Sequence, residues 1–154
     1  MRDLDRKILV QLVENSSQSV VEISSKVGAS RQTVAKKIKQ FGSDGTIKSF
    51  TARFNPEKFG LGTKAYVFLR EDPNIESRKK NEAAIGGLPQ VTEFYRLFGR
   101  YSAVFEVLVK DSKELTRMIK KIHKLKGVRE TETFIVHSTV KDRPEGPFLH
   151  ILKT

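Results

Sequence analysis

The sequence predicts an α+β protein, with an N-terminal helix-turn-helix domain of winged-helix-like type followed by a ferredoxin-like domain of element order β-α-β-β-α-β. Three observations indicate this fold class. Residues 3–41 contain three short amphipathic helical patterns, residues 55–62 concentrate proline and glycine, and residues 64–128 contain a weak internal repeat. A chain of 154 residues has room for two such small domains, and small domains often gain stability by oligomerisation.

The first three elements are predicted as helices because their apolar residues recur every three or four positions. Asp3, Ser19 and Ser30 are each placed to cap the helix that follows. Gly28 permits a tight exit from the second helix, so the second and third helices are joined only by residues 28–29. The apolar positions of the three helices are Leu4, Ile8, Leu9, Leu12 and Val13, then Val20, Ile23 and Val27, then Val34, Ile38 and Phe41.

Residues 46–54 are rich in β-branched and aromatic side chains, which predicts a strand that leaves the helical domain. The following residues, 55–62, contain one proline and two glycines and mark the domain boundary. The chain therefore divides into a helix-turn-helix domain over residues 1–50, a strand and linker over 51–62, a ferredoxin-like domain over 63–141, and a C-terminal tail over 142–154.

The second half of the chain repeats the order strand, helix, strand. Its strands are predicted at residues 65–70, 91–98, 103–110 and 128–140. The first helix has Pro73 in its first turn and reaches about Ile85, and the second begins at Asp111 or Ser112 and reaches Leu125. Helices cover only one face of such a sheet, yet residues 134–136 place apolar side chains on both faces. We therefore expect the uncovered face to meet another subunit.

The 29 basic and 18 acidic side chains leave a net charge of +11 at pH 7. A surplus of this size favours polyanions, because binding releases their condensed counterions, and double-stranded DNA is the first candidate. The density of positive charge is higher in residues 1–60, which carry eleven basic and six acidic side chains. The chain has no cysteine, no secretory signal pattern and no apolar run near the roughly 20 residues of a membrane span. These features predict a cytoplasmic, nucleoid-associated protein with no membrane role.

With these elements assigned, nearly the whole chain resembles the Lrp/AsnC family of feast/famine regulators. The order and spacing of several short motifs carry the resemblance. They are Leu4-Asp5-Arg6-Lys7-Ile8-Leu9, Val27-Gly28-Ala29-Ser30 with Thr33-Val34, Gly45-Thr46-Ile47, Asn55-Pro56 through Gly60, Phe98-Gly99-Arg100-Tyr101-Ser102, and Thr131-Glu132-Thr133. The resemblance implies a transcription regulator with an effector-binding ferredoxin-like domain, a homodimer built by sheet-to-sheet packing, and further assembly to a tetramer or octamer.

The third helix is the predicted DNA reader, because it carries basic side chains and no acid. Gln32 and Thr33 are predicted to read bases, since Gln can bond adenine at two atoms and Thr can contact a thymine methyl group. Arg31 is expected to read guanine or hold a phosphate, and the lysines to hold phosphates. The predicted DNA-binding residues are Ser30, Arg31, Gln32, Thr33, Lys36, Lys37, Lys39 and Gln40. A two-fold dimer presents two such helices about 34 Å apart, which predicts palindromic operators; a solvated helix face is the alternative.

By resemblance, the loop after the second sheet strand and the facing last strand form an effector pocket at a subunit interface, usually for an amino acid. Gly99, Arg100 and Tyr101 match the loop motif, but Ser102 stands where an acid would be expected to hold an α-amino group. The predicted effector-binding residues are Gly99, Arg100, Tyr101, Ser102, Thr131 and Thr133. The alternative is that Gly99 makes a hairpin turn and Tyr101 packs in the core.

An enzyme is the strongest competing class, because siroheme decarboxylases resemble the same two-domain arrangement and use His and Arg in the second domain. The three histidines, His123, His137 and His150, show no metal-ligand spacing, and no phosphate-binding loop, nucleophile elbow or dinucleotide fingerprint occurs. We therefore expect no catalytic residue, no metal and no cofactor beyond a possible amino-acid effector. A sequence-tolerant architectural DNA-binding protein is a third class, which the high net charge would suit.

Two further segments have no assigned role. The second-domain helix over residues 111–125 exposes basic side chains that either guide DNA around an oligomer or form a solvated face: Lys113, Arg117, Lys120, Lys121 and Lys124. The apolar part of the tail docks either on a neighbouring subunit or on its own chain: Pro147, Phe148, Leu149 and Ile151.

Overall fold

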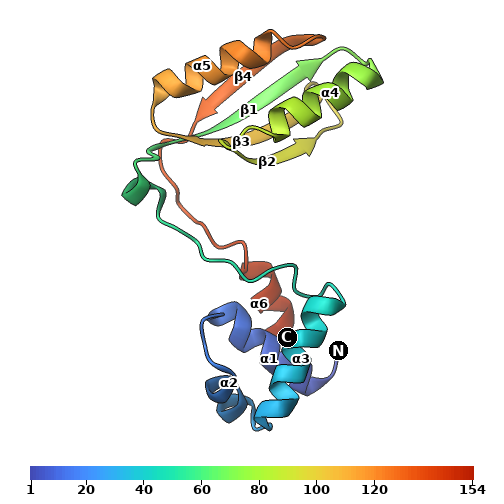
Figure 1. Cartoon of the computed structure of the whole chain (residues 1–154), viewed down its shortest axis with the longest axis vertical. Coiled ribbons are helices and arrows are strands. Elements are labelled where there is room, and N and C mark those ends of the chain that lie inside the picture. Colours follow the sequence, from blue (N-terminus) through green and yellow to red (C-terminus); the bar gives the residue numbers. More distant parts are fainter. The chain divides into compact units, whose positions relative to one another are not determined.

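The computed structural model describes residues 1–154 and divides them into two compact units (Figure 1). The N-terminal unit comprises Met1–Arg53 and Lys141–Thr154, and the sheet unit comprises Phe54–Val140. The N-terminal unit contains α1 (Asp3–Glu14), α2 (Val20–Val27), α3 (Arg31–Ser43) and α6 (Gly146–Lys153). The sheet unit contains η1 (Pro56–Phe59), β1 (Thr63–Glu71), α4 (Ile75–Gly86), β2 (Val91–Arg96), β3 (Ala103–Val109), α5 (Ser112–His123) and β4 (Val128–Ile135). None of the helices is both long enough and apolar enough to cross a membrane.

The predicted helix-turn-helix is confirmed, and local hydrogen bonds define its turn. Ser19 begins α2 with a capping box: its hydroxyl accepts from the Glu22 backbone N–H, and the Glu22 carboxylate accepts from the Ser19 N–H. Gly28 ends α2 with φ of 69°, a left-handed conformation that glycine adopts without strain. Ser30 then caps α3 by accepting from the Thr33 N–H. The three helices pack around one hydrophobic core, which includes the buried side chains Ile8, Leu9, Leu12, Ile23, Val34 and Phe41.

Two local predictions in this unit are wrong. Asp3 does not cap α1, because it already lies in the first turn, where its carboxylate pairs with Arg6 at 3.5 Å and Lys7 at 2.7 Å. Residues 46–54 do not form a strand. A strand needs a neighbouring backbone to complete its ladder, and within this segment only the Ile47 N–H donates to another backbone group, the Phe41 carbonyl at 2.8 Å.

The C-terminal tail belongs to the N-terminal unit. Helix α6 packs against α1, and Leu152, 8% exposed, joins the same core cluster as Leu9 and Leu12. The Lys153 Nζ lies 2.5 Å from Glu14 Oε1. The tail therefore docks on its own chain, one of the two alternatives that the sequence left open, but it does so through Leu152. Phe148 and Ile151, which were expected to dock, are 62% and 70% exposed.

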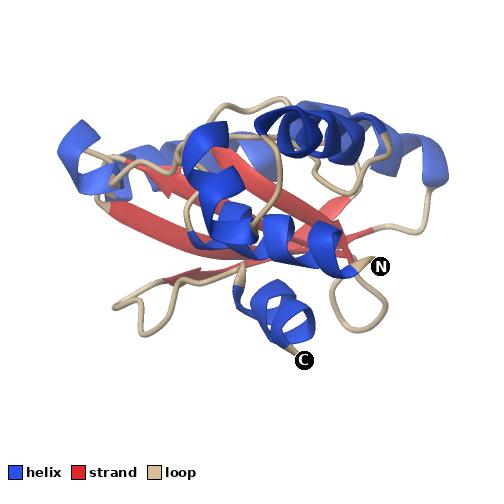
Figure 2. Cartoon of the chain, turned by 90° about the horizontal axis from the view of Figure 1, so that it is seen from below, coloured by secondary structure: helices blue, strands red, loops and turns tan.

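The sheet unit is a four-stranded antiparallel sheet of order β2-β3-β1-β4, with its strands drawn in red in Figure 2. Its core lies between the sheet and helices α4 and α5, and includes Val67, Phe105 and Ile122. Several boundaries differ from the prediction, among them the ends of β2 at Arg96 and of α5 at His123. Strand β4 ends at Ile135 and not at residue 140, and α4 begins after Asn74, whose side-chain carbonyl accepts from the Ser77 N–H. Pro73 therefore precedes the helix and does not lie in its first turn.

The other face of the sheet carries exposed aromatic side chains. Tyr66 lies opposite Phe134 and Glu106 in the strand register, so these three share one face. Phe134 is 52% exposed, and its ring lies 5.7 Å from that of Phe68, centroid to centroid. Apolar side chains thus occupy both faces of the sheet, as the alternation in the last strand predicted.

Candidate nucleic-acid interface and ligand site

Helix α3 presents one continuous polar surface without an acidic side chain. Arg31, Gln32 and Thr33 form its exposed first turn, and residues 36 and 39–40 extend this surface along the helix. The first turn of a helix has backbone N–H groups without intrahelical partners and a positive end of the helix dipole, which together attract anions. With no carboxylate present to compete, this end of α3 suits a phosphate group.

Ser30 and Thr33 are both engaged at the start of α3. The Ser30 Oγ accepts from the Thr33 N–H at 3.1 Å and lies 2.8 Å from the Thr33 Oγ1. Ser30 therefore fixes the direction of the helix, and Thr33 keeps its methyl group available for an apolar contact. Ser30 and Thr33 contact each other within one turn of the helix, so the sequence alone was sufficient to predict the cap.

Lys37 differs from the other lysines of α3. Its Nζ lies 2.8 Å from the Asp5 Oδ1, and the two side chains are only 18% and 14% exposed. This ion pair joins α3 to α1, so Lys37 helps to position α3, whereas the sequence had placed it among the phosphate contacts. The sequence grouped Lys37 with its neighbour Lys36, because helical periodicity does not show that Asp5 of another helix lies close to it.

The loop that joins β2 to β3 lies against the uncovered face of the sheet. The Tyr101 ring packs on Phe68 with 5.3 Å between centroids, and its hydroxyl donates to the Glu132 carboxylate, which raises the pKa of Tyr101. The Arg100 guanidinium lies over the Tyr101 ring, 5.2 Å from its centroid, and 3.7 Å from Glu130 Oε1. Gly99 has φ of 147°, a region that side chains rarely allow.

Ser102 ends this loop in a structural position. Its N–H and its hydroxyl both donate to the Leu69 carbonyl, at 2.8 and 2.9 Å, and its oxygen accepts from the Glu71 N–H at 3.2 Å. The hydroxyl is thus satisfied by the main chain of β1. Ser102 itself offers no negative charge to an α-amino group, and the nearby Glu71 carboxylate, 3.4 Å from its hydroxyl, is buried and paired with Arg96.

Thr131 and Thr133 share one sheet face, as expected, but it is not the face of Tyr101. They pair with Leu69 and Val67, whose side chains lie under the helices. Thr131 Oγ1 lies 2.5 Å from His123 Nε2 of α5. Within one chain the structure therefore separates the two threonines from the aromatic part of the loop, and brings Glu130 and Glu132 to it instead.

Glu71, at the end of β1, is a buried carboxylate near this loop that the sequence did not predict. The Glu71 side chain is 1% exposed and is held by an ion pair with Arg96 and by the Asn81 amide, which donates to its Oε1 at 2.7 Å. Arg96 also pairs with Glu82 at 2.5 Å. The one available signal is alternation along β1, where Glu71 continues the buried positions of Val67 and Leu69.

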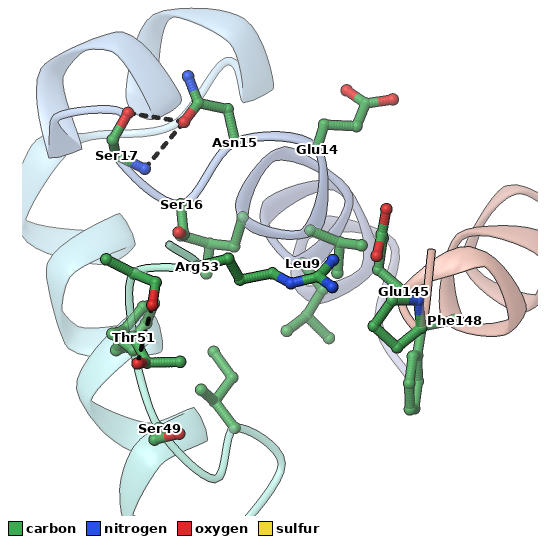
Figure 3. Close-up of a pocket in the computed structure, with 16 residues that line it drawn as sticks. Leu9, Glu14, Asn15, Ser16, Ser17, Ser49, Thr51, Arg53, Glu145 and Phe148 are labelled. Atoms are coloured by element: carbon green, nitrogen blue, oxygen red, sulfur yellow. Dashed lines mark hydrogen bonds between the residues drawn. The ribbon is translucent and has the colours of Figure 1, made fainter. Parts of the chain in front are cut away.

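The N-terminal unit contains a cavity of about 830 Å³ that the sequence did not indicate (Figure 3). Its apolar lining comes from α1, α6 and the segment after α3, and includes Leu9 and Phe148. Polar residues such as Arg53 and Glu145 also line it. Arg53 pairs with Asp142, which is the main reason that its pKa is raised. The positive charge of Arg53 is thus already paired with a carboxylate of the same unit.

The three histidines lie apart from any common site. His123 ends α5, His137 follows β4, and His150 lies on α6 of the N-terminal unit. Only His123 has a side-chain hydrogen-bond partner, Thr131.

Family profiles match both units. Residues 1–48 match the profile described as winged helix-turn-helix DNA-binding, and residues 64–146 match the profile described as Lrp/AsnC ligand binding domain. An uncharacterized HTH-type transcriptional regulator of Pyrococcus horikoshii is 31% identical over 90% of this chain and 94% of its own. The HTH-type transcriptional regulator FL11 of Pyrococcus furiosus is 31% identical over 94% of this chain and 95% of its own.

Solved structures agree along nearly the whole chain. An AsnC family transcriptional regulator from Agrobacterium tumefaciens has a TM-score of 0.88 at 28% identity, covering 98% of this chain and 99% of its own. A transcriptional regulator from Neisseria meningitidis, solved as a complex with L-Met, has a TM-score of 0.91 at 22% identity, with the same coverage.

Proposed function

This chain belongs to the Lrp/AsnC family of transcriptional regulators, and we propose that it binds palindromic operators in double-stranded DNA as a homodimer, under the control of an amino-acid effector. The observation that carries the proposal is the acid-free surface of α3, which begins in a capped and exposed first turn. A helix presented in this way fits the major groove and offers its N-terminal residues to base edges.

The side chains of α3 divide by chemistry. Gln32 and Thr33 read bases, because an amide can make two hydrogen bonds to adenine and a methyl group can contact thymine. Arg31, at the helix start, holds a phosphate or a guanine, and Lys36, Lys39 and Gln40 hold the backbone. Ser30 and Lys37 act indirectly, through the cap and through the Asp5 pair.

The dimer is proposed to form through the uncovered face of the sheet. Tyr66, Tyr95 and Phe134 are 38%, 55% and 52% exposed, which is unusual for aromatic side chains unless another surface covers them. A two-fold axis through this face relates two copies of α3, and a two-fold protein reads a palindromic site. Assembly of dimers to a tetramer or octamer belongs to the same proposal.

The effector is proposed to bind at the loop over residues 99–102. The Neisseria meningitidis structure is a complex with L-Met, which supports an amino acid as ligand. Arg100 is 70% exposed and can pair with a carboxylate, and Tyr101 adds an apolar surface. Since Ser102 is neutral, Glu130 and Glu132 are the acidic groups that we assign to the ammonium group. Thr131 and Thr133 then contribute only if another subunit brings them to the loop.

A gel-shift assay tests the DNA-binding part. Genomic fragments retained by the native protein supply the operator, and the variant Gln32→Ala/Thr33→Ala/Lys36→Ala is then compared with Lys79→Ala, an exposed lysine of α4. We expect the triple variant to lose the shifted band and the control to retain it. Unchanged operator binding by the triple variant would rule out α3 as the reading helix. A footprint at raised salt separates a regulator from an architectural protein, because only a specific complex keeps a defined protected site.

A thermal-shift screen against the amino acids tests the effector part. A ligand that binds only the folded protein raises its melting temperature. We expect at least one amino acid to do so, and Arg100→Gln to abolish the shift while Arg129→Gln, which removes an exposed arginine paired with Asp72, retains it. No shift with any amino acid would contradict this part of the proposal.

A further inference from the structure

Helix α5 carries a second basic surface, and we propose that it binds the phosphate backbone of double-stranded DNA without reading its sequence. The surface, called here the α5 basic stripe, consists of Lys113, Arg117, Lys120, Lys121 and Lys124. It lies in the sheet unit, outside the helix-turn-helix. The inference extends the proposed function from one DNA contact per chain to two.

The stripe is a continuous line along one side of the helix. At about 100° per residue, the five side chains fall within an arc of about 100°, and they span about 16 Å at 1.5 Å per residue. All five are exposed. The opposite side of α5 is fixed in the core by Leu115, Met118 and Ile122, which are at most 5% exposed. Burial on one side therefore holds the stripe outward.

The charges of the stripe are not neutralised within the chain. None of the five side chains forms an ion pair in the structure. The two acids at the start of α5 are engaged with the main chain: Asp111 accepts from the Glu114 N–H at 2.8 Å, and Glu114 accepts from the Lys110 N–H at 3.0 Å. The Arg117 charge is a smaller cause of the lowered pKa of both carboxylates, and the Lys113 backbone N–H and charge are smaller causes of the lowered pKa of Asp111. No acid follows in the sequence until Glu130.

This arrangement disfavours the helix itself. Lys113 and Arg117, Arg117 and Lys121, and Lys120 and Lys124 are like charges four residues apart, which repel each other on a helix surface. The helix dipole favours cations in the last turn, which accounts for Lys120, Lys121 and Lys124 but not for Lys113 and Arg117 near the start. An external polyanion would relieve the repulsion along the full length of the stripe.

The residue types indicate what kind of contact is made. Four lysines and one arginine, with no amide among them, form point-charge contacts to phosphates and offer little discrimination between bases. Duplex DNA carries one phosphate charge per about 1.7 Å of axis with both strands counted, so a 16 Å length of duplex carries about nine charges, about five of them on each strand. Among polyanions, duplex DNA is favoured because α3 of the same chain presents an acid-free face for it, and attachment through α3 raises the local concentration of DNA at the stripe.

The first test removes charge and measures salt dependence. The variant Lys120→Gln/Lys121→Gln/Lys124→Gln is compared with a matched control, Lys58→Gln/Lys79→Gln/Lys141→Gln, which removes three exposed lysines elsewhere. Binding to a generic duplex of about 80 base pairs is followed by fluorescence anisotropy at several salt concentrations. We expect the slope of log K against log salt to be shallower for the stripe variant by about 2.7, that is about 0.9 for each lost contact. Its loss of affinity relative to the native protein should therefore be largest at low salt and should shrink by a factor of about 500 for each tenfold rise in salt. Equal losses in both variants, or none in either, would overturn the proposal, and melting curves confirm that both are folded.

The second test locates DNA directly and uses the absence of native cysteine. Lys121→Cys is labelled with a photocrosslinker, Lys36→Cys serves as the positive control on α3, and Lys79→Cys on α4 serves as the negative control. We expect crosslinks to DNA from positions 36 and 121 and background from position 79. A yield at position 121 no higher than at position 79 would refute DNA binding by the stripe.

Failure of the stripe and failure of α3 give different results. If α3 does not read an operator, the Gln32→Ala/Thr33→Ala/Lys36→Ala variant keeps its operator binding, while the stripe variant still loses affinity for generic duplex. If the stripe does not bind DNA, operator selection by α3 remains and only the crosslink at position 121 and the change in salt slope disappear.

Discussion

Helices α3 and α5 have 13 and 12 residues, and each has one buried apolar side and one exposed basic side, yet their polar groups differ. On α3, the exposed cations are mixed with Gln32, Thr33 and Gln40. The exposed side of α5 carries five cations and no amide, and its Thr116 hydroxyl is bonded to the helix main chain. Positive charge attracts either helix to DNA, but only amide and hydroxyl groups carry a hydrogen-bond pattern that differs between bases. We propose that the composition of the exposed side separates the two roles, base reading by α3 and backbone holding by α5.

The supports of the two helices differ as well. Helix α3 begins at a neutral cap, Ser30, and is joined to α1 by the largely buried Lys37–Asp5 pair. Helix α5 begins at a charged cap, Asp111, and lies on a sheet. Polar contacts at defined atoms thus orient α3 in addition to the burial of Val34 and Phe41, while α5 is anchored mainly by apolar burial.

The largest expected effect is a loss of folding stability when a buried side chain is removed from either core. Ile122→Ala removes a 1% exposed side chain between α5 and the sheet, and Ile23→Ala does the same under α2 in the N-terminal unit. Each is expected to lower the free energy of unfolding by about 2–5 kcal/mol, because a cavity remains. Urea denaturation followed by circular dichroism measures this. Ile75→Ala, at a position 72% exposed, is the control and should change stability by less than about 0.5 kcal/mol.

The next prediction tests whether α3 reads bases while α5 only holds the DNA backbone. Gln32→Ala is expected to reduce the preference for operator over generic DNA by about 1–3 kcal/mol, since one bidentate contact is lost. Lys121→Gln should leave that preference unchanged and make the salt slope shallower by about 0.9. Competition binding with both duplexes over a salt series measures the two quantities together. If Lys121→Gln altered the preference as much as Gln32→Ala, the two helices would not differ in the way proposed.

A smaller effect concerns the neutral cap. Ser30→Ala removes the acceptor of the Thr33 N–H and is expected to lower the stability of the N-terminal unit by about 1 kcal/mol. Ser30→Asp restores an acceptor and serves as the matched control for stability. It also places a carboxylate where a DNA phosphate is proposed to lie, so it should weaken DNA binding while the melting temperature is retained.

Local features of the fold could be predicted from the sequence, because the residues that determine them are close together. Ser19, Gly28 and Ser30 define the tight turn through bonds to residues within a few positions, and the apolar periodicity defined the sheet and its two helices. By the same reasoning Asp3 was misplaced by one position, since several polar residues near a helix start satisfy the same pattern.

Features that depend on distant residues were not predictable from periodicity. The Lys37–Asp5 pair and the burial of Glu71 beside Arg96 join different elements, and the strand expected over residues 46–54 lacks a partner in this chain. The candidate ligand site shows the same limit. Alternation correctly placed Thr131 and Thr133 on one face, but only the strand register shows that Tyr101 lies on the other.

The smallest effect contrasts the charged cap of α5 with the neutral cap of α3 through pH. The Glu114 N–H, which donates to Asp111, holds the pKa of that carboxyl below its usual value of 3.8, with a smaller contribution from Arg117 and Lys113. Because the pKa is lower in the folded state, the contribution to stability is complete above about pH 3.8 and is lost as the pH falls through the lowered pKa. Unfolding by urea between pH 2.5 and 6, compared between the native protein and Asp111→Asn, should show a steeper loss in the native protein below this value. Ser30→Ala should lower stability by the same amount at every pH, since a hydroxyl does not titrate there, and a loss that Asp111→Asn leaves unchanged would assign the acid sensitivity to other carboxylates.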